Sequence, residues 1–340
     1  MINIAINGFG RIGRNIVRAI YEYGMHDQFR VVAINDLAPL DTSVHLLKYD
    51  STHGRFNADV RLEGDILRIN HDVVASFNER DPENLPWAKL KVDVVMECTG
   101  FFRTVEGANK HILAGARQVL ISAPAKGDIK TIVYGVNEQS IESTDLIVSN
   151  ASCSTNCLAH IAYAIEDSIG IKYGLVNTVH AYTNTQRLLD SAHKDKRRGR
   201  AAATSLIPTS TGSAKAIGKV IPSLEGKLDA VAVRVPTINV SLLDLSFVPK
   251  QSIGIDALNS LFATYKQGRE SVFDVSFEPL VSIDYNHDPR SCVVDGLQTR
   301  SVGKMIKVQA WYDNEWGFSN RMLDTARSMY LKQAKASSAE

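Results

Sequence analysis

Short apolar runs alternate with helical spacings through the first 150 residues of the chain. Ile2–Ile6 is an apolar run of strand length, and apolar positions between Ile16 and Tyr21 then recur at helical spacing. Later strand-like runs lie at Val31–Ile34, Val92–Glu97 and Gln118–Ser122. Strands that alternate with helices are typical of a mainly parallel sheet, so this part is predicted to be an α/β domain.

The pattern changes after about residue 150. Strand-like runs become longer and follow one another with few helices between them, at Gly174–Val179, Ala230–Val235, Val240–Val248 and Ile306–Tyr312. Helical spacings remain near Asp256–Lys266 and Ser319–Lys332. This order predicts an α+β domain with a mainly antiparallel sheet. We therefore expect a first domain over 1–150 and a second over 151–318. The last helix, about 319–332, should pack back on the first domain, with 337–340 as a frayed end.

Composition restricts the partners more than it defines the function. The 340 residues are 44% apolar and 22% charged, with a formal net charge of +1. This balance gives no strong positive electrostatic field that would attract nucleic acid or an anionic membrane. No apolar run reaches the ~18 residues of a membrane helix. Four cysteines are too few for a disulfide scaffold, which favours a reducing, cytoplasmic compartment. Because a strand is predicted from residue 2, no signal peptide is expected.

A glycine-rich turn joins the first predicted strand to the first predicted helix. Gly8 would make the tight turn, Gly10 would let the backbone approach a pyrophosphate, and Gly13 would let helix and strand pack closely. Asp36 ends the second strand 23 residues after Gly13, near the ~20 expected for a carboxylate that binds ribose hydroxyls. The first domain is thus predicted to be a Rossmann-type domain that binds a dinucleotide at a helix N-terminus.

Other candidate cofactor contacts follow from the same sheet. Ligands bind at the carboxyl ends of parallel strands, where Thr99 and Ser122 lie. Arg80 lies on a predicted loop. It is compatible with contact to an adenine and equally with a solvated side chain, and the sequence does not separate the two.

Cys153 is the candidate nucleophile. It stands in the small and hydroxylated segment Ser149–Cys157, just before a helix predicted at Leu158–Ile165. Free backbone N–H groups and the helix dipole at such a position favour an anion, so we expect a lowered thiol pKa. His180 ends the next apolar strand and is the candidate base. The pair predicts covalent catalysis.

Several groups in the second half are suited to bind an anion. Arg234 ends a strand, and Pro208–Gly212 is a hydroxyl- and glycine-rich turn that opens a helix at Ser213. A basic run, Ser191–Arg200, precedes that turn. These features favour a substrate that carries phosphate. No metal site is predicted, because no set of four ligands stands at zinc spacing.

Seven segments, taken in order, carry a resemblance to a known family. They are NGFGRIGR at 7–14, HLLKYDSTHGRF at 45–56, SNASCSTNC at 149–157, HAYTNTQ at 180–186, PTSTG at 208–212, RVPTINVS at 234–241 and WYDNEWGFSNR at 311–321. Through them the chain resembles phosphorylating glyceraldehyde-3-phosphate dehydrogenase over nearly its whole length. The resemblance implies oxidative phosphorylation of D-glyceraldehyde 3-phosphate to 1,3-bisphosphoglycerate in glycolysis and gluconeogenesis. It also implies NAD as cofactor, inorganic phosphate as second substrate and a homotetramer.

The resemblance implies a role for each site residue. Cys153 would attack the aldehyde to give a thiohemiacetal, His180 would act as the base, and phosphate would release the resulting thioester. Thr183 and Arg234 would hold the substrate phosphate. The attacking phosphate would be held by Ser152, Ser154, Arg198, Thr211 and Gly212, although Arg197 and Arg200 stand close to Arg198 and compete for its role.

The cofactor contacts implied by the resemblance include the predicted glycine turn. They are Gly8, Gly10, Arg11, Ile12, Gly13, Asp36, Arg80, Thr99, Ser122, Asn184 and Asn314. Asn314 would bind the nicotinamide carboxamide and fix which ring face receives hydride. The segment 182–203 would reach the cofactor pocket of a neighbouring subunit.

Four positions depart from the usual pattern of the family. Ser154 replaces a threonine and keeps the hydroxyl, and Phe318 replaces a common tyrosine. Ser191-Ala192 replaces a Leu-Pro pair and is similar to plastid forms that also accept NADP. Asp36 opposes NADP, because its charge repels a 2′-phosphate. NAD is therefore expected, with NADP use left open.

Two other functions are weighed against this one. The segments PLVSIDYNHDP at 279–289 and LQTR at 297–300 resemble erythrose-4-phosphate dehydrogenase. Thr183 and Thr211-Gly212 favour the triose phosphate, because a thioester that phosphate attacks needs those donors. A nucleotide- or nucleic-acid-binding protein that reuses the fold is the remote alternative, against which the near-neutral charge and the cysteine–histidine pair argue.

Overall fold

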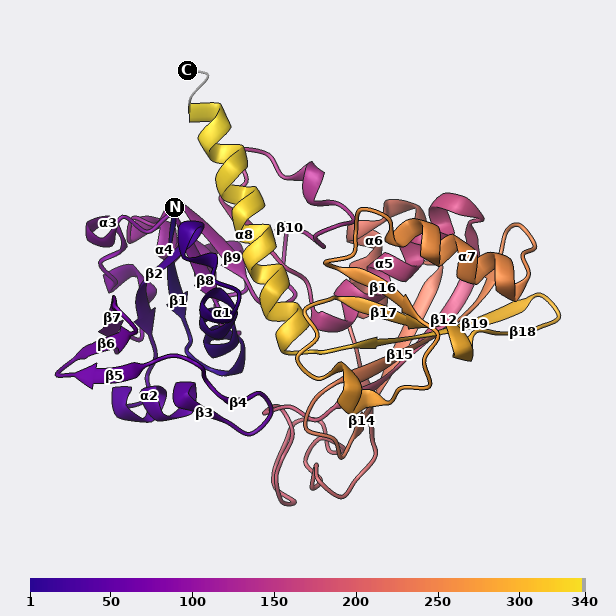
Figure 1. Cartoon of the computed structure of the whole chain (residues 1–340), viewed down its shortest axis with the longest axis horizontal. Helices are drawn as coiled ribbons and strands as arrows, with labels where there is room; N and C mark the ends of the chain where they lie inside the picture. The colour runs from indigo at the N-terminus through magenta and orange to yellow at the C-terminus, as the bar shows by residue number, and fades with distance from the viewer. Residues whose placement is uncertain (338–340) are drawn as a thin grey trace. The chain divides into compact units, whose positions relative to one another are not determined.

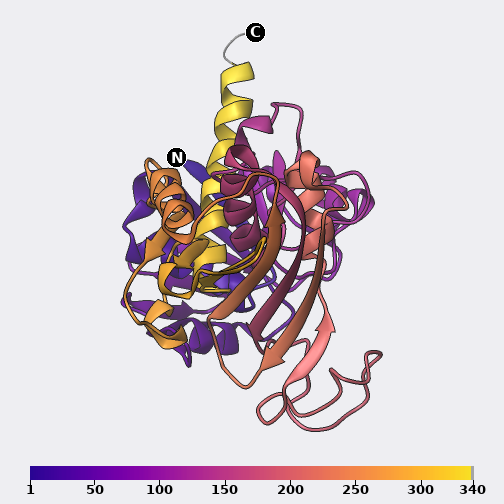
Figure 2. The same cartoon turned by 90° about the vertical axis from the view of Figure 1, so that its right-hand side faces the viewer.

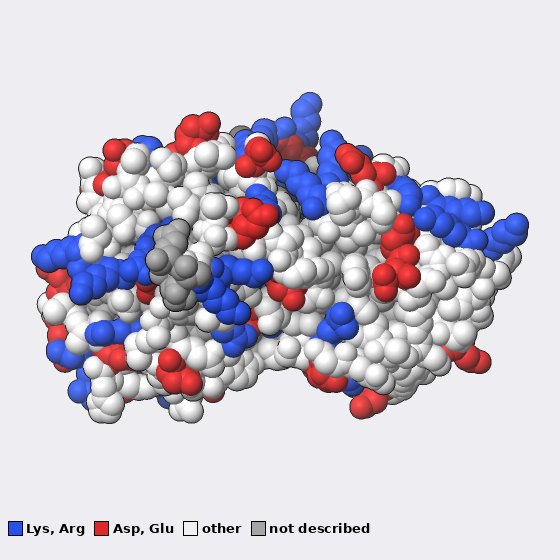
Figure 3. Space-filling view, turned by 90° about the horizontal axis from the view of Figure 1, so that it is seen from above, with Lys and Arg blue, Asp and Glu red and all other residues white. Residues whose placement is uncertain are grey.

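The chain divides into two compact units, each built around its own sheet. The computed structural model describes residues 1–337. Unit 1 comprises residues 1–151 together with the chain from Ser319 onward, and unit 2 is Ser152–Phe318. No helix within residues 1–337 is both long and apolar enough to cross a bilayer. On the face shown in Figure 3, acidic and basic side chains occur together, in keeping with the net charge of +1.

The main sheet of unit 1 has the strand order β10-β11-β9-β8-β1-β2-β7-β6-β5 (Figure 1). The strands are β1 (Ile2–Asn7), β2 (Phe29–Asn35), β5 (Val60–Glu63), β6 (Ile66–Ile69), β7 (Asp72–Phe77), β8 (Val94–Glu97), β9 (Gln118–Ile121), β10 (Lys130–Thr131) and β11 (Ile147–Ser149). From β10 to β7 every neighbouring pair is parallel, whereas β7, β6 and β5 are antiparallel. The predicted α/β class with a mainly parallel sheet is confirmed.

Unit 1 also contains α-helices and one short hairpin. They are α1 (Arg11–Glu22), α2 (Leu40–Lys48), β3 (Tyr49–Asp50), β4 (Gly54–Arg55), α3 (Trp87–Leu90) and α4 (Val105–Leu113). The helical spacing seen in the sequence explains α1, because Ile16, Val17 and Ile20 are all buried.

The C-terminal helix α8 (Trp316–Ser337) belongs to unit 1 from Ser319 onward. The side chain of Gln118 donates to the carbonyl of Met329 at 3.2 Å, and the Thr325 hydroxyl donates to Asn150 at 2.8 Å. The helix reaches Ser337, which was expected to be frayed, so that expectation is wrong at this residue. The rest of the expected frayed end, 338–340, lies outside the described residues.

A buried polar network lies beneath the end of the central strands of unit 1. Asn7 donates to Glu97 at 2.6 Å, and Asn35 donates to Asn7 at 2.7 Å. The Trp87 indole donates to Nδ1 of His111 at 3.0 Å. An indole N–H is a donor only, so the other ring nitrogen, 3.1 Å from Glu97, carries the proton and donates to the carboxylate. The network fixes the backbone from which the glycine turn departs.

Arg11, a predicted cofactor contact, forms an ion pair with Asp50. The Asp50 side chain is 2% exposed and also accepts from the backbone N–H groups of Thr52 and His53. Burial alone would raise the pKa of this carboxyl, but the hydrogen bonds from Arg11 and the backbone outweigh burial and lower it to about 2. The pair ties the start of α1 to the end of β3.

The substitution Asp50→Asn should destabilise the protein by about 1–3 kcal/mol, because it leaves a guanidinium beside a neutral amide. The contribution of Asp50 to the free energy of unfolding is complete above pH 3.8 and disappears as the pH falls towards 2. The destabilisation by Asp50→Asn is therefore measured by urea unfolding at pH 7. The matched control is Asp59→Asn, since Asp59 pairs with Arg61 at 2.6 Å but is 52% exposed. The control should cost less than about 1 kcal/mol, and equal losses in both variants would contradict the assignment.

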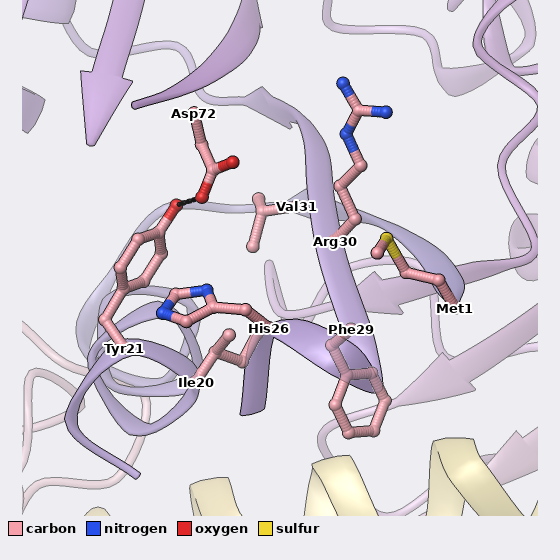
Figure 4. Close-up of a pocket in the computed structure, with 8 residues that line it drawn as sticks. All are labelled: Met1, Ile20, Tyr21, His26, Phe29, Arg30, Val31 and Asp72. Atoms are coloured by element: carbon pink, nitrogen blue, oxygen red, sulfur yellow. Dashed lines mark hydrogen bonds between the residues drawn. The ribbon is translucent and has the colours of Figure 1, made fainter. Parts of the chain in front are cut away.

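A pocket of about 200 Å³ lies at the amino ends of β2 and β7 (Figure 4). Its lining includes Met1, His26 and Arg30. The Tyr21 hydroxyl donates to Asp72 at 2.6 Å across it, and burial, followed by this bond, raises the pKa of Tyr21. Ligands of parallel sheets bind at the carboxyl ends of strands, so this pocket is separate from the predicted cofactor site.

Unit 2 is built on a sheet with the order β13-β14-β12-β15-β19-β17-β16, and β18 pairs with β19. Its strands are β12 (Ile171–Ala181), β13 (Ile207–Ser210), β14 (Leu228–Val235), β15 (Ser241–Pro249), β16 (Phe273–Ser276), β17 (Cys292–Asp295), β18 (Arg300–Val302) and β19 (Met305–Tyr312). The pairs β12–β14 and β16–β17 are parallel and the other pairs are antiparallel. The predicted mainly antiparallel sheet is confirmed.

The two faces of the unit 2 sheet differ. Helix α5 (Cys153–Ser168) packs on β12, β15, β17 and β19, with α6 (Ser213–Val220) beside it, and α7 (Ile255–Lys266) packs on β16. Figure 2 shows the long strands running side by side. On β12 and β14, Tyr173, Leu175 and Val231 are each more than half exposed. They line a hollow of about 620 Å³, so this face of the sheet carries apolar side chains that nothing within residues 1–337 covers.

Candidate active site

Cys153 is the first residue of α5. The preceding Ser152 is the N-cap, and its hydroxyl accepts from the backbone N–H of Thr155 at 3.2 Å. Ala151 before it has φ of 58°, in the left-handed region that a residue with a Cβ seldom adopts. This turn places the thiol at the helix N-terminus, as the sequence indicated.

His180 faces the thiol from the neighbouring strand β12. Its Nε2 lies 3.5 Å from Sγ of Cys153. His180 is 4% exposed, and its ring packs against that of Tyr312 in a T-shaped arrangement at a centroid distance of 6.1 Å. Thiol and imidazole are therefore within reach for proton transfer.

Arg234 is the third member of the cluster. Parallel pairing of β12 with β14 sets Arg234 directly opposite His180. Its Nη1 lies 2.8 Å from Nδ1 of His180 and donates to the carbonyl of Ala181 at 3.0 Å. Its Nε is buried and has no hydrogen-bond partner among the described residues. A buried guanidinium with an unused donor is suited to bind an anion.

The charge state of the pair differs from the expected one. Burial raises the pKa of the Cys153 thiol, while the Arg234 charge acts in the opposite direction. Burial, followed by the Arg234 charge, lowers the pKa of His180 to about 3. The expectation of a lowered thiol pKa is therefore wrong, because desolvation outweighs the effect of the helix N-terminus. Transfer of the thiol proton to His180 would form the thiolate nucleophile.

Acid should destabilise the protein through His180. An unfolded chain binds a proton on this histidine near pH 6.5, whereas the folded protein resists protonation down to about pH 3. The contribution of His180 to the free energy of unfolding is therefore fully present above pH 6.5 and is lost as the pH drops towards 3. We expect His180→Gln to flatten the dependence of unfolding free energy on pH between 7 and 5, measured with urea. The exposed His26 provides the control, since His26→Gln should keep the wild-type slope; equal slopes in all three proteins would contradict the assignment.

The other predicted anion-binding residues lie in unit 2 on either side of β13. Thr183 is partly buried, and its hydroxyl contacts that of Thr185 at 2.9 Å. Thr211 and Gly212 form the turn before α6, where a Cβ on Gly212 would meet nothing within 4 Å. The turn leaves open space at a helix N-terminus, which suits an oxyanion.

Arg198 differs from its two neighbours in the basic run. Its Nε donates to Thr209 of β13 at 2.8 Å, and its side chain is 22% exposed. Arg200 is 66% exposed and pairs with Asp190, and Arg197 is also exposed. The charge of Arg198 also lowers the pKa of His180, as a smaller cause than burial and the Arg234 charge. This effect favours Arg198 over Arg197 and Arg200 as the arginine that binds the attacking phosphate.

Two further residues of the site were not predicted. Tyr312 contacts the Ser154 hydroxyl at 2.8 Å and fixes it beside the nucleophile. Ser241 accepts from the Ala181 backbone at 3.2 Å and donates to the Asn314 amide oxygen at 2.9 Å. Both lie within quoted motifs, RVPTINVS and WYDNEWGFSNR, so the signal was present as polar residues at strand ends.

The glycine turn of unit 1 fits a bound dinucleotide. A Cβ on Gly8 would lie 2.7 Å from the Thr99 nitrogen, and one on Gly13 would lie 2.4 Å from the Gly8 oxygen. A Cβ on Gly10 would meet nothing within 4 Å, and the first turn of α1 has no acidic residue. The turn is therefore closed where helix and strand meet and open at the helix N-terminus, as a pyrophosphate requires.

The remaining cofactor candidates differ in their contacts. Asp36 accepts from the Phe9 and Ala38 backbone at 2.6 and 2.8 Å, which fixes its carboxylate at the end of β2 while leaving acceptor capacity for ribose hydroxyls. Thr99 donates to Glu97, and the Ser122 backbone donates to the Glu97 carbonyl at 3.0 Å. The other three lie at the surface or near it, with Arg80 and Asn184 exposed and Ile12 half-buried.

Fold and site together define an oxidoreductase class: a dinucleotide-binding unit joined to a unit with a cysteine nucleophile, a histidine and anion-binding arginines. Family models agree with this division. Residues 2–105 match the NAD binding domain of glyceraldehyde 3-phosphate dehydrogenase, and residues 152–314 match its C-terminal domain.

Curated relatives match over nearly the whole chain. The plasmid-encoded glyceraldehyde-3-phosphate dehydrogenase of Cupriavidus necator is 51% identical, covering 96% of this chain and 97% of its own. Those of Pseudomonas aeruginosa and Zymomonas mobilis are 49% and 50% identical, each covering 96% of this chain and 98% of its own. The chain belongs to the glyceraldehyde-3-phosphate dehydrogenase family. The predictions of an NAD-dependent enzyme with the glycolytic activity of this family are confirmed.

Proposed function

We propose that the chain oxidises D-glyceraldehyde 3-phosphate to 1,3-bisphosphoglycerate by covalent catalysis at Cys153. The observation that carries this proposal is the cluster of Cys153, His180 and Arg234, with Sγ 3.5 Å from Nε2. We assign NAD binding to a domain over 1–150 with the helix from 319, and catalysis to 151–318. The cofactor is held by the glycine turn with Arg11 and Ile12, by Asp36, and by the other predicted contacts, Arg80, Thr99, Ser122, Asn184 and Asn314.

The first step joins the substrate to Cys153. Sγ attacks the aldehyde carbon, the carbonyl pair moves to oxygen, and the thiol proton passes to Nε2 of His180. The backbone N–H of Cys153, at the start of α5, and the protonated imidazole stabilise the resulting oxyanion. Thr183 and the unused Nε of Arg234 hold the substrate phosphate.

The second half of the reaction releases the acyl group. When bound at the glycine turn, NAD would supply the hydride acceptor, and loss of hydride from the substrate carbon would leave a thioester on Cys153. A phosphate oxygen then attacks the thioester carbon, the carbon–sulfur bond breaks, and the thiolate leaves. Ser152, Ser154, Arg198, Thr211 and Gly212 hold this phosphate.

Initial rates with two aldehydes and two cofactors test the proposal. Glyceraldehyde 3-phosphate with NAD and inorganic phosphate should give the highest kcat/KM, and leaving out phosphate should stop steady turnover. A higher kcat/KM with erythrose 4-phosphate than with glyceraldehyde 3-phosphate would show that the proposed substrate is wrong. Equal efficiency with NADP would overturn the NAD preference expected from Asp36.

We also propose a homotetramer in the cytoplasm. The uncovered apolar face on β12 and β14 and the exposed Leu188 and Leu189 of segment 182–203 support assembly. Sedimentation should give a mass of four chains, and Leu175→Asp should reduce it. A monomer at micromolar concentration would contradict assembly. Four unbridged cysteines support a reducing compartment, and cell fractionation tests the location.

A further inference from the structure

A hydroxyl on a neighbouring strand holds the side-chain amide of Asn314. Ser241, the first residue of β15, donates to Oδ1 of Asn314 at 2.9 Å. The same hydroxyl oxygen accepts from the backbone N–H of Ala181 at 3.2 Å. Pairing of β15 with β19 sets Ser241 opposite Tyr312, the last residue of β19, so the register of the sheet brings Ser241 beside Asn314.

The preceding carboxylate fixes the backbone around Asn314. Asp313 is 1% exposed and accepts from the backbone N–H groups of Glu315 and Trp316 at 2.9 and 2.7 Å. It also accepts from the side-chain amide of Asn239 at 2.8 Å. These bonds hold the turn that joins β19 to α8, so the freedom left to Asn314 is rotation of its own side chain.

Ser241 restricts that rotation. The amide of an asparagine has an oxygen that only accepts and an NH2 group that only donates. The Ser241 hydroxyl binds the oxygen, so the NH2 group of Asn314 keeps both protons, and it has no hydrogen-bond partner within residues 1–337. Ser241 and Asn314 are 1% and 7% exposed, so water competes little for the bond between them. The pair thus holds a hydrogen-bond donor ready for a ligand.

We propose that Ser241 is a positioning residue that presents the NH2 group of Asn314 to the carbonyl oxygen of the nicotinamide carboxamide. This inference rests on the proposed function, in which Asn314 contacts NAD. A carboxamide offers either its oxygen or its amino group to a neighbour, and the two orientations differ by half a turn about one bond. An asparagine fixed as a donor binds only the first. Ser241 therefore acts through Asn314, without contact to the cofactor.

The same hydroxyl also fixes the strand end that carries His180. Ala181 directly follows His180 on β12, and its N–H donates to Ser241. A change at Ser241 therefore affects the placement of the base as well as that of the Asn314 amide. Binding of ligands to the unreacted enzyme separates these two effects, because it does not depend on the base.

The test compares two ligands by calorimetry on the full chain freed of bound nucleotide. Ser241→Ala should raise the Kd for NAD about three- to tenfold, as expected for one neutral hydrogen bond. It should leave unchanged the Kd for ADP-ribose, which lacks the nicotinamide. Ser241→Thr keeps the hydroxyl and should stay nearer the wild type.

The matched control is Ser291→Ala. Ser291 is 4% exposed, and its buried hydroxyl has no hydrogen-bond partner among the described residues. This variant removes a buried serine hydroxyl from the same unit without touching Asn314, so both Kd values should equal those of the wild type.

Two further measurements test whether Ser241 acts through a donating Asn314. In an Asn314→Ala background the amide is absent, so Ser241→Ala should cause no additional loss of NAD affinity. The analogue 3-acetylpyridine adenine dinucleotide keeps the carbonyl oxygen and has a methyl group in place of the amino group. Ser241→Ala should weaken binding of this analogue by the same factor as binding of NAD.

The inference is overturned if Ser241→Ala leaves the Kd for NAD unchanged or weakens NAD and ADP-ribose equally. It is also overturned by a further loss in the Asn314→Ala background, or by a loss with NAD that is absent with the acetyl analogue. Turnover of glyceraldehyde 3-phosphate by the wild type is measured in the same preparation. A wild type that binds NAD and turns over, with any of these results, loses the role of Ser241 and retains the proposed function. A wild type that neither binds NAD nor turns over loses the proposed function itself.

Discussion

Replacing Cys153 with serine is expected to lower kcat by about four orders of magnitude or more. A serine hydroxyl is far less nucleophilic than a thiol, and a neutral His180 facing it is too weak a base to compensate. The substitution changes one atom at the start of α5, so the N-cap of Ser152 and the helix should remain. NAD binding, measured by calorimetry, should be close to wild type, since the glycine turn lies in unit 1.

The control for this variant is Cys157→Ala. Cys157 lies one turn further along α5 and is fully buried, so the variant removes a thiol from the same helix without touching the reacting atoms. It should retain activity and lose only some stability. A Cys153→Ser protein that kept more than a few per cent of wild-type activity would exclude covalent catalysis at this residue.

Replacing His180 with asparagine is expected to lower kcat by about 10²–10⁴. Asparagine keeps a polar side chain near the thiol but cannot take its proton, so attack must wait for the small fraction of thiolate formed by loss of a proton to solvent. Because burial raises the thiol pKa, that fraction is small at neutral pH. Activity of the variant should therefore rise steeply with pH where the wild type has levelled off.

The control here is His26→Asn, an exposed histidine at the pocket of unit 1. Its kcat and pH profile should match those of the wild type. A His180→Asn enzyme with an unchanged pH profile and a loss confined to KM would show that His180 binds substrate and does not transfer a proton.

Local features of the sequence predicted much of this structure. The glycine turn was identified because strand, glycines and helix are consecutive, and the steric demands at Gly8 and Gly13 follow from that order. The placement of Cys153 at a helix start depended on Ser152 and the apolar run after it, which are also local.

Features that depend on pairing between distant strands were not predicted. Arg234 and His180 are 54 positions apart, and only the register of β12 with β14 brings them into contact. Arg11 pairs with Asp50, 39 positions away, and no local pattern in the sequence indicated that pair. The pKa of Cys153 depends on burial by several elements, which no local pattern reports, so its direction was mistaken.

A thioester on Cys153 that waits for phosphate is the most direct test of the proposed chemistry. The enzyme is mixed with glyceraldehyde 3-phosphate and NAD without phosphate, stopped with acid, and digested for mass spectrometry. The peptide with Cys153 should carry a phosphoglyceroyl group with about one NADH formed per chain, and added phosphate should remove the group and restart turnover. An unmodified Cys153 during steady NADH formation without phosphate would contradict covalent catalysis and phosphate release.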